Sequence, residues 1–414
     1  MAKLVLIDGH AIIHRAYHAF PPTLQNSKGE QTNAVYGFTS ILLATIKDLH
    51  PKYMAVVFDK KGPTFRHKKF KEYKGTRVKP DKEMLMQIPR IKQVVKALNL
   101  PIFEERGFEA DDVIGTLAFQ AKVQNFKPKA PSSKQFQNIK LLNRKTKTLK
   151  LSNSNTLEVI IVTGDQDALQ LVNDRVKVWM PARSAGGPPR GRFVPAKMYK
   201  AEDVVKKLGV RPDQVVDYKA LVGDQSDNIP GVVGIGPKTA GELLQKFGTV
   251  KEIYKSLGPG GRVDGKVTLK MQKDTKITEN SRQIKESIRG KLITGYESAM
   301  MSYDLARIHT DAPVKLILKD CVLSDYNKEE TVRVFEELEF KSLIKRLPDD
   351  GWEEMAREAL GSRAVKSRRA VELESRGAGE RENKKTGMPD SGIGMRKKIK
   401  REQEKKEGEQ MGLF

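Results

Sequence analysis

The sequence has little cysteine, few aromatic residues and no long apolar run. Its 414 residues include one cysteine, Cys321, and aromatic residues make up 7%. A single cysteine excludes an internal disulfide framework and a cysteine-rich metal site, so we expect Cys321 to be a small buried hydrophobic residue. No apolar stretch approaches the roughly 18 residues that a membrane helix needs. The N-terminus lacks the pattern of a signal peptide. These absences predict a cytoplasmic protein that does not contact a membrane.

Positive charge is abundant and unevenly distributed. The chain has 76 Lys or Arg against 52 Asp or Glu, a net charge of +24. An excess of this size favours a polyanionic partner, most often nucleic acid. Residues 349–414 hold 16 Lys or Arg and 14 Asp or Glu, and few large apolar residues. That composition cannot bury enough surface to offset chain entropy, which predicts a charged, disordered tail.

Strand and helix patterns alternate in the first half of the chain. Near-continuous apolar runs at 4–7, 55–58 and 159–162 are separated by helical patterns around Val35–Leu49 and Ile88–Leu98. This alternation predicts an α/β fold with a mostly parallel central sheet and helices on both faces. Two segments are expected to lie outside the core, a basic insert at about 122–157 and a loop insert at about 258–290.

Nine carboxylates occur where such a sheet would gather them. Three of the apolar runs end in acids, a fourth group opens a predicted helix, and a fifth pair lies beside a turn. In open parallel sheets, ligands bind at the carboxyl ends of the strands. Taken singly, each acid could equally be a helix cap or a turn residue. The nine are Asp8, Asp59, Glu109, Asp111, Asp112, Asp165, Asp167, Asp224 and Asp227.

Converging carboxylates would need cations. Two unit charges 4 Å apart repel by about 4 kcal/mol at an effective dielectric near 20. No histidine or cysteine accompanies these acids, so the predicted ligands are all hard oxygens, which suit Mg²⁺ or Mn²⁺ better than zinc. Two such ions could activate a water molecule and stabilise the leaving oxygen of a phosphodiester.

A glycine-rich hairpin, NIPGVVGIGPKTAG, lies at 228–241. Pro237 suits the first position of a helix and Gly248 the position past its end. The glycines would let backbone amides approach a phosphate at the helix N-terminus, in a helix-hairpin-helix that holds DNA without reading bases. The alternative is a glycine-rich turn between core helices. The candidate phosphate-binding residues are Gly231, Gly234, Gly236, Lys238 and Thr239.

A basic segment at about 60–96 contains 13 Lys or Arg against three acids, with Phe65, Phe70 and Tyr73 interleaved. Basic residues with aromatics suit a single strand, since charges follow its backbone while rings stack on bases. An ordinary solvated basic face remains an equal alternative. Three histidines at i, i+4 spacing, from His10 to His18, suggest a metal only superficially, because the acids need no imidazole partner.

Together these motifs resemble the 5′-nuclease (flap endonuclease) family, specifically the N-terminal 5′ to 3′ exonuclease domain of bacterial DNA polymerase I. The matching stretches are LIDGHAIIHRAYHAF, NAVYGF, VVFDKKGPTFRHKKFKEYKGTR, GFEADDVIGTLA, VTGDQDALQLV and YKALVGDQSDNIPGVVGIGPKTA. The resemblance implies a PIN-like nuclease domain over 1–182, a helix-hairpin-helix subdomain over 183–348 and the tail over 349–414.

The resemblance also assigns roles to residues. It implies a first metal cluster of Asp8, Asp59, Glu109, Asp111 and Asp112, and a second of Asp165, Asp167, Asp224 and Asp227. Lys74 and Arg77 match the base of the family's helical arch, next to the scissile phosphate. Arg15 and Tyr73 match positions near the substrate strand. The family's hairpin commonly binds K⁺ as well as duplex DNA.

The implied activity is a metal-dependent 5′ to 3′ exonuclease and 5′-flap endonuclease that removes flaps and RNA primers in DNA replication and repair. We expect a monomer that binds branched, flapped or RNA-primed DNA. The tail is too short to hold a polymerase domain, so the chain is expected to be either a free-standing nuclease or the nuclease half of a split polymerase I system with a separate polymerase as partner.

Two other functional classes stay open on the residues alone. One is a nuclease-like protein that binds branched DNA without cleaving it, and the other is an RNA-cleaving nuclease with a similar acid-lined sheet. A pure binder has no need of nine acids facing a polyanion. An RNA-cleaving enzyme has no need of a duplex-binding hairpin.

The C-terminus, QMGLF, resembles the short motif by which bacterial replication proteins bind the sliding clamp. An apolar pair on a polar tail suits insertion into a pocket. An idle terminus is an equal alternative, because so few positions are fixed. The candidate clamp-binding residues are Gln410, Leu413 and Phe414.

Overall fold

The computed structural model describes residues 2–124, 157–185, 192–257, 262–263, 266–267, 284–323 and 326–347. All of them belong to one compact unit, Met1–Ala359. The predicted tail lies outside the described residues, as do nearly all of the basic insert and most of the loop insert.

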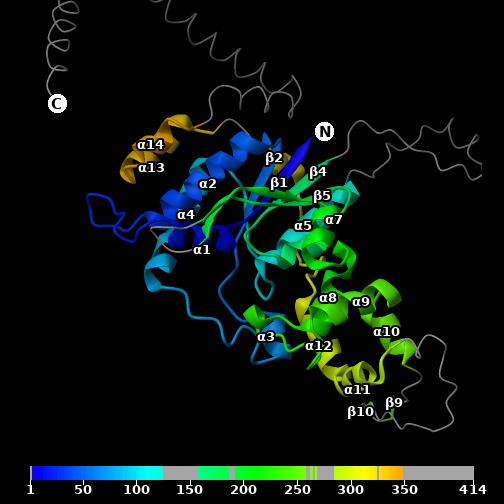
Figure 1. The fold of residues 1–414 in the computed structure, drawn as a ribbon. Coiled ribbons are helices and arrows are strands. Elements are labelled where there is room, and N and C mark those ends of the chain that lie inside the picture. The colour runs from blue at the N-terminus through cyan, green and yellow to red at the C-terminus, as the bar shows by residue number, and fades with distance from the viewer. Residues whose placement is uncertain are drawn as a thin grey trace, which may run out of the picture. The chain divides into compact units, whose positions relative to one another are not determined.

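A six-stranded sheet forms the centre of this unit, in the order β3-β2-β1-β4-β5-β8 (Figure 1). Every pairing is parallel except that of β5 with β8, which is antiparallel. This confirms the predicted mostly parallel sheet. The strands are β1 (Lys3–Asp8), β2 (Tyr53–Val57), β3 (Ile102–Phe103), β4 (Glu158–Val162), β5 (Val176–Met180) and β8 (Lys197–Tyr199).

Both faces of the sheet are buried. Alternate side chains of a strand point to opposite sides of the sheet, and here each side meets a hydrophobic core. In β1, Leu4 and Leu6 belong to one hydrophobic core, while Val5 and Ile7 belong to another. Different helices cover the two cores (Figure 1). Helices α1 (Gly9–Ala19), α2 (Asn33–Leu49), α4 (Lys82–Ala97), α13 (Lys328–Glu337) and α14 (Lys341–Ile344) supply the second core, and α5 (Ala110–Gln124) and α7 (Ala201–Leu208) supply the first.

A helical subdomain follows the sheet. Its helix α8 packs along α12, and its glycine hairpin leads into α9. The helices are α8 (Val215–Val222), α9 (Pro237–Phe247), α10 (Val250–Ser256), α11 (Glu286–Thr294) and α12 (Tyr296–Ala306), with short 3₁₀ turns η2 (Pro212–Gln214) and η3 (Gln225–Asp227). This agrees with the predicted helical subdomain.

Residues after the predicted boundary at 182 also contribute to the sheet and to its second core. Strand β8 extends the sheet past that residue, and α13 and α14 return to the core beside α2 and α4. The remaining elements are α3 (Phe65–Lys69), 3₁₀ turns η1 (Asp167–Leu171) and η5 (Leu318–Cys321), and the pairs β6 (Arg183–Ala185) with β7 (Arg192–Val194) and β9 (Arg262–Val263) with β10 (Lys266–Val267).

Cys321 is fully buried, as predicted, and burial raises the pKa of its thiol to about 12. Among the described residues, no helix has the length and apolar character to cross a membrane.

Candidate active site

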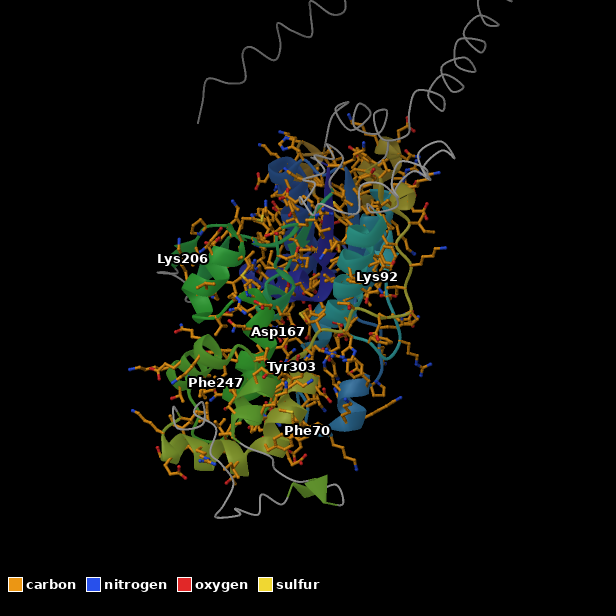
Figure 2. The ribbon with its side chains drawn as sticks, turned by 90° about the vertical axis from the view of Figure 1, so that its right-hand side faces the viewer. Phe70, Lys92, Asp167, Lys206, Phe247 and Tyr303 are labelled. Atoms are coloured by element: carbon orange, nitrogen blue, oxygen red, sulfur yellow. The ribbon has the colours of Figure 1, made fainter. Side chains whose placement is uncertain are left out.

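Most of the predicted acids lie at one edge of the sheet. Asp8 ends β1, Asp59 follows β2, and Asp165 and Asp167 follow β4, so parallel pairing brings these positions to the same edge. The N-terminus of α5 meets them there, since the backbone amide of Ala110 donates to the Asp59 carboxylate at 2.7 Å. Figure 2 shows Asp167 near the middle of the molecule, where the sheet meets the helical subdomain.

The carboxylates lie close enough to perturb one another. Burial, together with the charges of Asp59 and Asp165, raises the pKa of Asp8 to about 7. Burial and the charges of Asp165, Asp8 and Asp167 raise the pKa of Asp111 well above its usual range. Burial also raises the pKa of Asp167 to about 7, despite a cationic partner. The fold therefore holds acids together against their mutual repulsion.

Thr163 and Arg15 support this edge of the sheet. The hydroxyl of Thr163 donates to the Asp8 carboxylate at 2.7 Å and accepts from the backbone amide of Asp165 at 2.9 Å. The guanidinium of Arg15 lies beside Gly164, 3.7 Å from where a Cβ would stand, and donates to the carbonyl of Pro181 at 2.9 Å. Arg15 thus reaches the loop that carries Asp165.

Basic side chains bind several of these acids directly. Lys74 donates to Glu109 at 2.9 Å, and Arg77 pairs with Asp227. Lys219 of α8 contacts both Asp167 and Asp224, the latter at 2.6 Å. Lys219 thus joins Asp224 to Asp167 at the sheet edge.

As the side chains stand, no three His, Cys, Asp or Glu residues in the described ranges are arranged to enclose a metal ion. Lys74, Arg77 and Lys219 occupy oxygens of Glu109, Asp227, Asp167 and Asp224. Lys219 was missed by the sequence analysis. Its one signal is its place on the helix that leads into Asp224.

Asp112 differs from the prediction that it is a ligand of the first metal cluster. Its side chain is fully buried and accepts two hydrogen bonds from Arg66, at 2.7 and 2.8 Å. Its oxygens also accept from the backbone amides of Glu109 at 3.1 Å and His309 at 2.8 Å. Both oxygens of Asp112 are thus bound, and it anchors the start of α5 through Arg66, which also lies 3.4 Å from the Glu109 carboxylate.

The aromatic residues of the basic segment also differ from the prediction that they stack on bases. Tyr73 is only 3% exposed and packs against Ile229 and Leu305. Its hydroxyl lies 3.0 Å from the Asp227 carboxylate and 3.2 Å from that of Glu109. Phe65 packs against His309 with ring centroids 4.5 Å apart. Phe70 packs against the same small core as Tyr73, whereas Phe65 lies apart from it.

His10 is a second neighbour of the acids that the sequence analysis set aside. Its Nδ1 accepts from the backbone amide of Asp59 at 2.9 Å, and its ring packs edge-on against Phe58. It therefore contacts the turn that carries Asp59. His14 and His18 contact each other instead, with ring centroids 4.5 Å apart.

The glycine hairpin forms as predicted. Pro237 begins α9 and Gly248 follows its last residue with a φ of +84°. Gly231 has a φ of +64°, and a Cβ there would lie 2.3 Å from the backbone nitrogen of Gly223, so only glycine fits. Gly236 caps α9, which places Lys238 and Thr239 in the first turn beside free backbone amides. The candidate clamp-binding residues lie outside the described residues.

Two family models match different parts of the chain. Residues 3–133 match the model of the 5′-3′ exonuclease N-terminal resolvase-like domain, and residues 210–329 match that of the 5′-3′ exonuclease C-terminal SAM fold. DNA polymerase I of Caldicellulosiruptor bescii is 37% identical over 345 residues, which cover 83% of this chain and 33% of that protein. The chain thus spans about a third of such polymerases.

A relative of similar length also matches. The 5′-3′ exonuclease of Aquifex aeolicus is 33% identical over 347 residues, covering 84% of this chain and 96% of that protein. Among solved structures, a bacteriophage T5 5′-exonuclease with bound zinc aligns with a TM-score of 0.49 and 18% identity, over 81% of this chain and 98% of that one. By its two matched domains and its full-length relative, the chain belongs to the 5′-3′ exonuclease family.

Proposed function

We propose that the carboxylates at the sheet edge form the catalytic centre of a 5′ to 3′ exonuclease and 5′-flap endonuclease that hydrolyses DNA phosphodiester bonds. One observation carries this proposal. The fold keeps Asp8, Asp111 and Asp167 close together although burial and repulsion raise the pKa of each. A site that is unfavourable without a ligand is expected where a cation binds in function.

The donor set fits a hard divalent cation. Each candidate ligand is a carboxylate, which suits Mg²⁺ or Mn²⁺. When bound, two such ions would lower the pKa of a water molecule and stabilise the leaving oxygen. Asp8, Asp59, Glu109 and Asp111 would hold one ion, and Asp165, Asp167, Asp224 and Asp227 the other. Asp112 would support α5 through Arg66. A K⁺ ion at the hairpin remains an inference from the resemblance alone.

Lys74 and Arg77 would act on the substrate. Both are already at the acids, and each has a raised pKa because nearby carboxylates outweigh the effect of burial. They therefore stay charged at neutral pH. When cations occupy the carboxylates, these two groups become available to stabilise negative charge on the phosphate. Arg15 would hold the loop of Gly164 and Asp165 in place beside it.

The hairpin would hold the duplex part of the substrate. Backbone amides at the N-terminus of α9, with Lys238 and Thr239, suit a phosphate and carry no base specificity. Gly234 and Gly236 are exposed and would allow the close approach. Gly231 would instead shape the turn, because it is buried and its amide donates to the Ser302 hydroxyl at 3.0 Å. A duplex held there and a 5′ strand cut at the acids correspond to a flap junction.

We further propose that the protein removes flaps and RNA primers in the cytoplasm during replication and repair, as a monomer. A separate polymerase would then fill the gap. Gln410, Leu413 and Phe414 would attach the enzyme to the sliding clamp. These proposals rest on the family and on the C-terminal motif.

The test is cleavage of a 5′-end-labelled flap duplex with Mg²⁺ or with EDTA, read on a sequencing gel. An Asp165→Asn and Asp167→Asn double variant removes two candidate ligands. Asp174→Asn is the control, because it changes an exposed acid that precedes β5, at the opposite end of the parallel strands. We expect Mg²⁺-dependent release of the flap by the wild type and the control, and its loss in the double variant. Binding of the flap without cleavage in Mg²⁺ or Mn²⁺ would instead favour the non-cleaving binding protein.

A further inference from the structure

A short loop carries Asp224 and Asp227 and contacts the basic segment. Residues 224–229 form a closed turn, because the backbones of Asp224 and Ile229 exchange two hydrogen bonds of 2.8 Å. Within it, Asn228 has a φ of +56°, and its side-chain amide donates to the carbonyl of Glu72 at 2.8 Å. The amide therefore crosses from the helical subdomain to the residue just before Tyr73.

Two more contacts follow the same path. The backbone amide of Lys74 donates to the carbonyl of Asp227 at 2.9 Å. The Nε of Arg77 donates to the carbonyl of Ser226 at 3.1 Å, and its guanidinium pairs with Asp227. Residues 72–77 thus lie along the loop that carries Asp224 and Asp227.

Lys74 needs this support because its own backbone is unfavourable. Its φ is +55°, in the left-handed region that residues with a Cβ rarely adopt. Such a conformation persists only where surrounding contacts determine it. Two contacts hold this stretch. The Asn228 side chain binds the carbonyl of Glu72, and the backbone amide of Lys74 binds the carbonyl of Asp227.

We propose that Asn228 is a positioning residue that fastens residues 72–77 to the loop 224–229. It would thereby hold Lys74 and Arg77 beside Asp224 and Asp227. This inference rests on the proposed role of Lys74 and Arg77 at the phosphate. Asparagine suits the position twice over, because it tolerates a positive φ and supplies a short amide donor. Aspartate would keep the conformation and lose the donor, and glycine would keep the conformation and lose the side chain.

The first test measures the fastening without DNA. Hydrogen–deuterium exchange at the Lys74 amide is compared in wild type, Asn228→Gly and Asn228→Asp. We expect exchange to rise by about 5- to 10-fold in Asn228→Gly, the scale of one neutral hydrogen bond. Asn228→Asp should exchange faster still, because its carboxylate would face the Glu72 carbonyl. Amides of β2 should not change.

The matched control is Asn99→Gly. Asn99 is an exposed asparagine that also has a positive φ, 53°, and it lies two residues after the end of α4. We expect this variant to leave exchange at Lys74 unchanged. Unchanged exchange at Lys74 in both Asn228 variants would overturn the proposal. If Asn228→Asp does not fold, Asn228→Gly alone decides the result.

The second test separates positioning from DNA binding. With saturating flap DNA and Mg²⁺, the single-turnover cleavage rate of Asn228→Gly should fall about tenfold. Its Kd for the same DNA in Ca²⁺ should stay within about twofold, because Gly234, Gly236 and the first turn of α9 are untouched. A loss confined to affinity would overturn the proposal, as would an unchanged rate. If even the wild type fails to cleave, the proposed function fails, and the exchange measurement still tests the fastening.

Discussion

The sheet edge and the glycine hairpin would both act on phosphates, and they are built in opposite ways. The sheet edge uses charged side chains that repel one another. Burial, together with this repulsion, raises the pKa of Asp8 and of Asp167 to about 7. The hairpin would use backbone amides at the N-terminus of α9, beside the exposed Gly234 and Gly236. We infer that the first region costs stability until a cation binds, whereas the second is part of the fold whether or not a ligand is present. Substitutions should therefore separate function from stability at the sheet edge and couple them at the backbone of the hairpin.

The largest expected effect is at the sheet edge. Asp111→Asn removes a charge that lies among Asp165, Asp8 and Asp167. We expect flap cleavage to fall by a factor on the order of 10²–10³, the scale of losing one group that stabilises transition-state charge. The melting temperature of the metal-free variant at pH 8 should rise, because repulsion is relieved. Cleavage rates and calorimetry measure both. A lower melting temperature, with Asp174→Asn unchanged, would contradict the contrast.

At the hairpin, Gly231→Ala should lose stability and DNA binding together. Its Cβ would lie 2.3 Å from the nitrogen of Gly223 at a φ of +64°. We expect a loss of about 2–5 kcal/mol in the free energy of unfolding, from strain and overpacking combined. Gly209→Ala is the matched control, since Gly209 has a φ of +74° with nothing within 4 Å. That variant should lose only about 1–2 kcal/mol. Equal losses in urea unfolding would show that the close approach is unimportant.

The pH dependence of stability gives a smaller effect, confined to the sheet edge. Asp8 and Asp167 have folded pKa values of about 7, against a usual value of 3.8. Raised pKa values mean that the folded state binds these protons more tightly. Their contribution is therefore present at low pH and is lost as pH rises from about 4 through 7. We expect Mg²⁺ to raise the melting temperature more at pH 8 than at pH 6, measured against EDTA. An equal Mg²⁺ effect at both pH values would argue against binding at these acids.

The smallest expected effect is Lys238→Ala in the first turn of α9. If this side chain contacts one phosphate, the slope of log affinity against log salt should fall by about one. Affinity for duplex DNA of any sequence should weaken alike, and the melting temperature should stay unchanged. Fluorescence anisotropy at several salt concentrations measures this, with Lys206→Ala on α7 as the control. A sequence-dependent loss would contradict binding through the backbone.

The sequence predicted the sheet and most of its acids because both follow from local pattern. Apolar runs that end in Asp8, Asp59 and Asp165 must bring those acids to one edge if their strands are parallel. The hairpin was equally clear, since Pro237 and the glycines fix its backbone.

Contacts between distant segments could not be predicted in this way. Asp111 and Asp112 are neighbours at the start of a helix, and only the packing of Arg66 shows that both oxygens of Asp112 are already bound. The burial of Tyr73 depends on Ile229 and Leu305, far along the chain. Strand β8 is three residues long, and its antiparallel pairing with β5 leaves no local signal.

The most direct test of the central claim is a Mn²⁺ titration followed by electron paramagnetic resonance at pH 7.5. Wild type, Asp111→Asn and Asp174→Asn would be compared without DNA. Our account predicts two bound ions in the wild type and in Asp174→Asn, with weaker or fewer ions in Asp111→Asn. Identical Mn²⁺ binding by all three proteins would contradict the claim that the acids at the sheet edge are a cation site held together at the expense of stability.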